Sequence, residues 1–107
     1  GEIIAVVGDQ RGPEDGIRVP FFGRQSAVNE GIAVLALKTG APIIFSITIR
    51  QSNNTYVTEV CEVSMENLPE GKQEKIVEIS RRHTAILEEY IRKYPEQWFW
   101  MHNRWKY

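Results

Sequence analysis

One long amphipathic stretch constrains the fold of this chain more than any other feature. Between Lys72 and Tyr94 the large apolar residues recur at helical spacing: Ile76, Ile79, Ile86, Leu87, Tyr90, Ile91 and Tyr94. This period predicts an α-helix with one apolar face, which must pack against another layer of structure. Pro95 follows directly, so we expect the helix to end there or a short new helix to begin with Pro95 in its first turn.

The residues before this helix predict strands and one shorter helix. Ile3–Val7 is a short apolar run bounded by Gly8, which is typical of a buried strand. Ala27–Lys38 has apolar residues at helical spacing, and Gly40 is suited to end that helix. Ile43–Ile49 is rich in β-branched residues and predicts a central strand.

A turn-forming Ser-Asn-Asn then predicts that Tyr56–Val63 returns as the second strand of an antiparallel hairpin. Because Ile3–Val7 and Ile43–Ile49 flank a helix, we expect them to be parallel neighbours joined by a right-handed crossover. The order strand, helix, strand, strand, helix therefore predicts an α/β fold. It would contain a partial mixed sheet and a long C-terminal amphipathic helix, in a single domain over residues 1–107.

Composition excludes several classes of function. The chain has 107 residues, 42% of them hydrophobic and 25% charged, as in ordinary globular domains. Its net charge of −1 gives no global field that would attract nucleic acid. No apolar run approaches the length that spans a bilayer. Cys61 is the only cysteine, so no internal disulfide forms, and no residue pattern indicates a metal or a cofactor.

The segment Gly8–Gly16 is a loop, and Val19–Gly23 is expected to be an apolar bulge within the same loop. It follows the first predicted strand, and ligands of α/β proteins commonly bind at that end of a strand. There Asp9 could orient a basic side chain or a sugar hydroxyl, and Arg11 could meet a phosphate. A plain turn closed by the Asp9 side chain explains the same residues about as well.

His83 and Glu88 have the spacing of a base and its orienting carboxylate. Both lie inside the long predicted helix, where five residues at about 100° each turn the second side chain about 140° away from the first. They therefore point to different faces. We expect His83 to be a packed structural residue, and Glu88 to pair with Arg92 at the favourable spacing of four.

The last thirteen residues, Pro95–Tyr107, hold three Trp beside His, Arg and Lys. A final amphipathic helix, with Trp98 and Phe99 covering the core, would explain part of this composition. A membrane-interface segment would also explain it, because aromatic rings lie at headgroup depth and cations meet lipid phosphates. Single-stranded nucleic acid is disfavoured, since its binding requires a wider basic surface.

Taken together, these motifs resemble the lipid A biosynthesis acyltransferases of the Kdo2-lipid A lauroyl/myristoyl type. The pattern covers nearly the whole chain, and its closing motif is the most specific part. The matching residues are Asp9–Gln10, Phe21–Gly23, Gly31–Ala36, Thr39–Pro42, Pro95–Trp98 and His102–Lys106. Residues Ala27–Glu30 depart from the family's Thr-rich stretch.

The resemblance implies an enzyme that moves a fatty acyl group from acyl carrier protein or acyl-CoA to a hydroxyl of a lipid A precursor. It also implies a location at the cytoplasmic side of the bacterial inner membrane. The family's catalytic His-x4-Asp/Glu lies in the amino-terminal half of its members, so no catalytic residue is assigned here. The start at Gly-Glu-Ile-Ile agrees with a carboxy-terminal portion of a glycerolipid-acyltransferase-like fold that is inactive by itself.

The resemblance also suggests which residues meet the substrate and the membrane. The candidates for substrate binding are Asp9, Gln10, Arg11, Arg50, His102, Arg104 and Lys106. Trp100 and Trp105 are the candidates for contact with an anionic membrane surface. The rival interpretation is a non-catalytic lipid- or protein-binding module that descends from the enzyme. The unpaired edge expected for strand Ile3–Val7 further predicts self-association.

Overall fold

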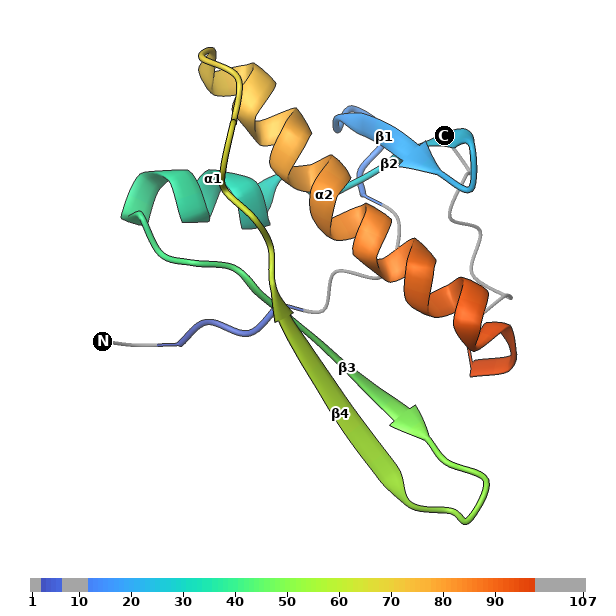
Figure 1. The fold of residues 1–107 in the computed structure, drawn as a ribbon. Coiled ribbons are helices and arrows are strands. Elements are labelled where there is room, and N and C mark those ends of the chain that lie inside the picture. The colour runs from blue at the N-terminus through green and yellow to red at the C-terminus, as the bar shows by residue number, and fades with distance from the viewer. Residues whose placement is uncertain (1–2, 7–11, 98–107) are drawn as a thin grey trace.

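The structure is a computed structural model that describes residues 3–6 and 12–97. Two hairpins, a short helix and a long helix make up a mixed α/β fold (Figure 1). In chain order the elements are β1 (Arg18–Phe21), β2 (Arg24–Ala27), α1 (Gly31–Thr39), β3 (Ile44–Arg50), β4 (Tyr56–Glu62), α2 (Lys72–Lys93) and the 3-10 turn η1 (Pro95–Gln97). The strands pair only within each hairpin, so the described part has two separate antiparallel sheets.

The first hairpin replaces the apolar bulge that was expected at Val19–Gly23. Phe21 pairs with Arg24, and the two residues between them have φ angles of 52° at Phe22 and 74° at Gly23. Two positive φ angles define the tight turn whose twist matches that of paired strands. The expectation was wrong because Val19 and Phe21 alternate onto one buried face while Pro20 faces outward.

Helix α1 begins at Gly31, four residues later than the predicted start at Ala27. Ala27 is still part of β2, and its carbonyl accepts a hydrogen bond from the amide of Gly12. The side chain of Asn29 then accepts a hydrogen bond from the Gly31 amide, which turns the chain into the helix. The predicted stop is confirmed, since Gly40 has φ 72° and its amide bonds the carbonyl of Ala36.

The predicted hairpin of the second half is confirmed, with Ile47 opposite Glu59 at its centre. It extends away from the rest of the molecule (Figure 1), and Tyr90 of α2 holds one face of it. The Tyr90 ring stacks on the ring of Phe45, with 5.9 Å between the ring centroids. The Tyr90 hydroxyl donates to a Glu59 carboxylate oxygen over 3.0 Å. That hydrogen bond is the main cause that raises the pKa of Tyr90 above its ordinary value.

The expected parallel strand at Ile3–Val7 is not found. Residues 3–6 have no regular structure, and the side chains of Ile3, Ile4 and Val6 are exposed. Apolar residues favour a strand only where a neighbouring strand and a covering layer accept them, and the described residues provide neither at this segment. The prediction of a single mixed sheet was therefore wrong. The predicted self-association rested on the edge of that expected strand, and it stays a prediction.

Helix α2 organises the core, as its period predicted. It lies between α1 and the β1–β2 hairpin (Figure 1) and joins two apolar clusters. Near its start, Ile76 and Ile79 pack with Ala33 of α1. Near its end, Leu87 and Ile91 pack with Phe21, and Phe22 and Phe45 adjoin that cluster. Pro95 then opens the 3-10 turn, in agreement with the prediction that it restarts a short helix.

Candidate functional site

Of the residues assigned to substrate or membrane from the sequence, the structure describes only Arg50. The others lie outside the described residues: Asp9, Gln10, Arg11, Trp100, His102, Arg104, Trp105 and Lys106. Trp98 and Phe99, which were expected to cover the core, also lie outside them. The candidate site is therefore built from Arg50 and from other described residues that carry polar contacts.

Arg50 is the last residue of β3 and is exposed. Its amide donates to Oε1 of Gln97, and its carbonyl accepts from Nε2 of Gln97, both over 3.0 Å. These bonds use only the backbone of Arg50, so the guanidinium is left to meet an anion. They also hold Gln97, the last residue of η1, beside the end of β3.

Gly12 anchors the end of the predicted binding loop. It is buried, and its amide donates to the carbonyl of Ala27 over 2.8 Å. A Cβ atom at this position would lie 2.2 Å from the carbonyl carbon of Val28, so only glycine fits there. The chain that follows Asp9–Arg11 is thereby held against the segment that leads from β2 into the amino terminus of α1.

The turn at Phe22-Gly23 is held by a carboxylate from α2. The Phe22 amide donates to Oε1 of Glu88, 66 residues later in the chain. The other oxygen of Glu88 accepts from Arg92, whose Nε and Nη2 lie 3.2 and 3.1 Å away. The guanidinium of Arg92 also lies over the Phe22 ring, 4.6 Å from its centroid. The expected pairing of Glu88 with Arg92 is confirmed, but the bond to Phe22 was not predicted.

His83 lies on the buried face of α2, with 9% of its surface exposed. Ser80 and Thr84 are buried beside it in sequence, at the middle of the helix. The carboxylate of Glu88 is engaged by Phe22 and Arg92 instead. This arrangement agrees with a structural role for His83 and gives the His-x4-Glu spacing no catalytic geometry.

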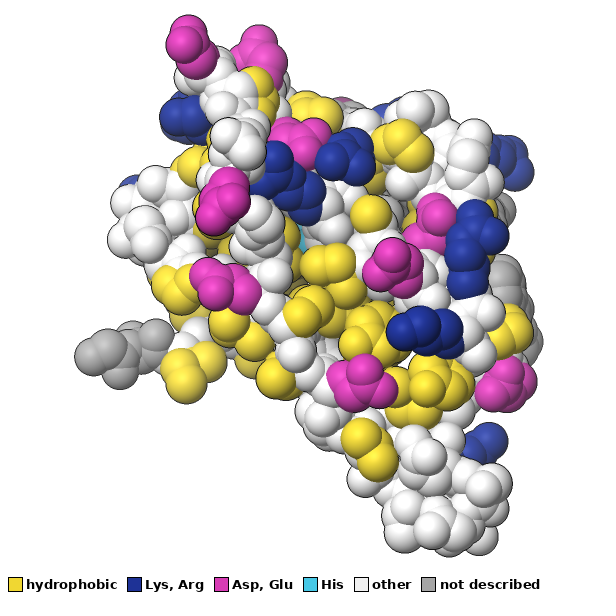
Figure 2. Space-filling model, viewed as in Figure 1, with side chains coloured by type: hydrophobic (Ala, Val, Ile, Leu, Met, Phe, Trp, Pro, Cys, Tyr) yellow, Lys and Arg dark blue, Asp and Glu magenta, His cyan; other side chains and the backbone are white. Residues whose placement is uncertain are grey.

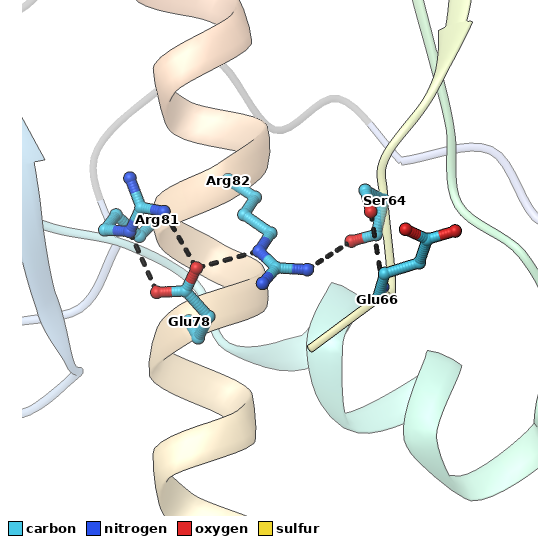
Figure 3. Close-up of polar contacts among 5 residues, drawn as sticks. All are labelled: Ser64, Glu66, Glu78, Arg81 and Arg82. Atoms are coloured by element: carbon cyan, nitrogen blue, oxygen red, sulfur yellow. Dashed lines mark hydrogen bonds and ion pairs between the residues drawn. The ribbon is translucent and has the colours of Figure 1, made fainter. Parts of the chain in front are cut away.

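A third polar cluster ties α2 to the connection that follows β4 (Figure 3). Arg81 donates to both oxygens of Glu78, over 2.9 and 2.8 Å, and Arg82 donates to one of them over 2.7 Å. Arg82 also reaches the carbonyl of Ser64 over 2.8 Å. The bond from Arg81, and after it the bond from Arg82, lowers the pKa of Glu78 from 4.5 to about 2. The cluster is a structural tether rather than a reactive group.

Other kinds of site find little support in the described residues. Residues 3–6 and 12–97 contain no group of three His, Cys, Asp or Glu side chains placed to hold a metal ion. None of the helices in that part is long and apolar enough to cross a bilayer. A hollow at the start of α2 is lined by Pro69, Gln73, Glu74, Val77 and Glu78. Its lining has two carboxylates and no basic side chain, which disfavours the binding of a phosphate.

The surface in Figure 2 shows apolar side chains gathered between α2 and the β3–β4 hairpin, with acidic and basic side chains interspersed. Side chains of one charge do not dominate this face, which agrees with the net charge of −1. Recognition of an anionic ligand must therefore rest on individual basic residues such as Arg50 and Arg92, whose side chains are exposed.

These features describe a mixed α/β protein in which one long helix braces two hairpins, with the basic side chains of Arg50 and Arg92 among those open to solvent. Comparison with protein families identifies it further. The model for bacterial lipid A biosynthesis acyltransferases matches residues 1–107, the whole chain, and the chain therefore belongs to that family. A search of the curated proteins gives no match.

Sequence reasoning missed the contacts of Gln97 with Arg50 and of the Glu88 carboxylate with the Phe22 amide. Both join residues far apart in the chain, and no local pattern predicts such pairs. One signal was available for the turn itself: Phe22-Gly23 follows a strand-like Val-Pro-Phe and precedes polar residues that can return along it.

Proposed function

We propose that this chain takes part in the transfer of a fatty acyl group from a thioester donor to a hydroxyl of a lipid A precursor. The donor would be acyl carrier protein or acyl-CoA. The observation that carries the proposal is the family match over residues 1–107, together with motifs spread from Asp9 to Lys106. A general base would take the proton of the acceptor hydroxyl as it attacks the thioester carbonyl, and the donor thiol would leave.

No residue of this chain is assigned as that base, because His83 is buried and Glu88 is bonded to the β1–β2 turn. The role proposed for residues 1–107 is to place the acceptor. Asp9, Gln10 and Arg11 would contact it from the loop that Gly12 anchors, and Arg50 would meet one of its phosphates. This part would then share the glycerolipid-acyltransferase-like fold with a catalytic half, and the purified 107-residue chain should show no turnover.

The experiment is a steady-state assay of the complete enzyme with Arg50→Gln. Since the bonds to Gln97 use the backbone of Arg50, this change removes the charge and leaves the fold intact. Loss of a charge-assisted phosphate contact should raise KM for the acceptor roughly ten-fold, with the KM for the donor unchanged. Lys38→Gln, which removes an exposed charge at the end of α1, is the matched control. An unchanged KM for Arg50→Gln would remove that residue from the site.

The same assay separates the enzyme from the rival binding module. If the complete wild-type protein binds donor and acceptor but transfers no acyl group, the module is favoured. If it transfers the group, the enzyme is favoured.

We further propose that the terminal aromatic and basic residues contact the anionic cytoplasmic surface of the inner membrane. Trp100 and Trp105 would lie at headgroup depth, while His102, Arg104 and Lys106 meet lipid or saccharide phosphates. Basic residues near such a surface contribute about 1 kcal/mol each, and salt screens that contribution. Co-sedimentation with vesicles should therefore be stronger for anionic than for neutral lipid and should weaken with salt. Equal binding to both lipids would contradict the interfacial assignment.

A further inference from the structure

Phe22 is a large residue at a turn position whose left-handed backbone conformation disfavours large side chains. Phe22 has φ 52° and is followed by Gly23 with φ 74°, so both central residues of the turn are left-handed. Glycine, asparagine and aspartate adopt that conformation readily, whereas a large side chain adopts it only under strain. The Phe22 backbone is therefore strained at a position where a small polar residue would be relaxed.

Contacts with Glu88, Arg92 and Phe21 are among those that hold Phe22 in this conformation. Oε1 of Glu88 accepts its amide, the guanidinium of Arg92 lies 4.6 Å from the centroid of its ring, and the ring of Phe21 meets it edge-on at 4.9 Å. The two bonds from Arg92 to Oε2 fix the carboxylate in turn. Strain that is held in place from several sides is characteristic of residues whose side chain has a use at that position.

The surface around Phe22 is apolar and cationic at once. Its ring is half-buried at the edge of the cluster of Phe21, Leu87 and Ile91. The Arg92 side chain beside it is 60% exposed, and its bonds to Glu88 use Nε and Nη2, which leaves Nη1 for another acceptor. A ligand that fits both groups has an acyl or other apolar part next to an anionic oxygen.

We propose that the Phe22 ring contacts the substrate and helps to set its specificity, and that Glu88 is the positioning residue that holds the ring in place. The substrate class is a molecule that carries both an acyl chain and a phosphate group. A phosphopantetheine-linked acyl donor and a lipid A precursor share this chemistry. This inference rests on the proposed function and adds a contact from the β1–β2 turn, which the sequence motifs alone did not assign to any ligand.

The test uses the complete enzyme with Phe22→Asn, which removes the ring but suits a left-handed turn residue before Gly23. Relief of the strained turn offsets part of the packing that is lost with the ring, so we expect a small change in melting temperature and a fall of about ten-fold in kcat/KM, through KM. The KM that rises, for donor or for acceptor, identifies which substrate the ring meets, and the loss should vary with acyl chain length. Tyr56→Asn, which removes an exposed ring from β4, is the matched control and should leave KM unchanged.

Glu88 is tested by its effect through Phe22. Glu88→Ala should raise the same KM as Phe22→Asn, and Glu88→Gln, which retains an acceptor for the Phe22 amide, should restore most of it. Adding Glu88→Ala to Phe22→Asn should change KM no further, because a residue that acts only through the ring has nothing left to position. A merely structural Glu88 would lower the melting temperature in both backgrounds and leave KM where it was.

Phe22→Tyr covers the case in which Phe22→Asn does not fold. It keeps the ring and the fold, and it should shift the preference for acyl chain length. A wild-type KM and chain-length profile in whichever of the two variants folds would overturn the inference while the proposed function stands. Absence of acyl transfer by the wild-type enzyme would overturn both.

Discussion

The side-chain amide of Gln97 pairs with the backbone of Arg50, 47 residues earlier, as a neighbouring strand would. The amide of Val63 donates to the carbonyl of Ile43, and the amide of Gln51 donates to the carbonyl of Thr55. In this antiparallel register the backbone N–H and C=O groups of the odd-numbered residues of β3 therefore point toward β4. The peptide groups of Arg50 therefore point to the outer edge of the hairpin. A single glutamine occupies, at this position, the edge that a third strand was expected to fill.

Gln97→Ala should remove both bonds and release the start of the terminal segment from β3. Each exposed hydrogen bond contributes roughly 0.5 kcal/mol or more, so we expect a loss of about 1 kcal/mol in the free energy of unfolding. Hydrogen exchange of the Arg50 amide should accelerate as well. Glu96→Ala, at the exposed neighbouring position, controls for the change in helix propensity. Unaltered protection of the Arg50 amide would show that the pair does not persist in solution.

His83→Ala should lower the free energy of unfolding by roughly 1–3 kcal/mol, because the imidazole fills buried space at the middle of α2. In the complete enzyme, His83→Gln should retain most of the turnover, whereas a true general base would lose about 10²–10⁴-fold. Chemical denaturation and steady-state kinetics measure the two effects. Glu89→Ala, exposed on the same helix, is the control. A collapse in turnover at an unchanged melting temperature would reinstate His83 as a catalytic candidate.

Thr84 provides a test of buried polar groups in α2. Its Oγ1 and the Oγ of Ser80 are buried and have no hydrogen-bond partner among the described residues. Replacing an unpaired hydroxyl by a methyl group of the same shape avoids a desolvation penalty, so Thr84→Val should be neutral or stabilise by about 1 kcal/mol. Thr58→Val is the matched control and should be mildly destabilising, since it removes the 3.0 Å bond to Thr48. A loss of stability in Thr84→Val would instead indicate a bound water at this position.

Glu78 should make stability depend on pH at the acidic end. Because its pKa is lowered from 4.5 to about 2 in the folded state, its contribution is complete above the unfolded pKa and is lost as pH falls toward about 2. The carboxylate is 24% exposed, so two ion pairs at this surface contribute about 1 kcal/mol together. The difference in unfolding free energy between wild type and Glu78→Gln should therefore be present near neutral pH and vanish near pH 2.

Glu74→Gln, exposed one turn earlier in α2, serves as the control for the loss of a carboxylate from this helix. A difference between wild type and Glu78→Gln that stays constant across the whole pH range would show that the arginine pairs do not stabilise the folded state.

The periodic parts of the fold could be read directly from the sequence. The apolar period of Lys72–Tyr94 predicts α2, the β-branched run of Ile43–Ile49 predicts β3, and Gly40 predicts the end of α1. Each of these depends on residues within a few positions of one another. Backbone geometry and side-chain direction then follow from local chemistry.

The family was also readable from the sequence, because its motifs are short runs of particular residues, and the match over residues 1–107 confirms it. Only the tertiary structure decided that β1 pairs with β2 and which polar groups far apart in the chain meet. Ile3–Val6 has the composition of a strand, yet no strand among residues 12–97 pairs with it. Phe22 is held in its left-handed turn by Glu88, 66 residues away. Pairings of this kind depend on the position of a partner far along the chain, and no local pattern encodes that position.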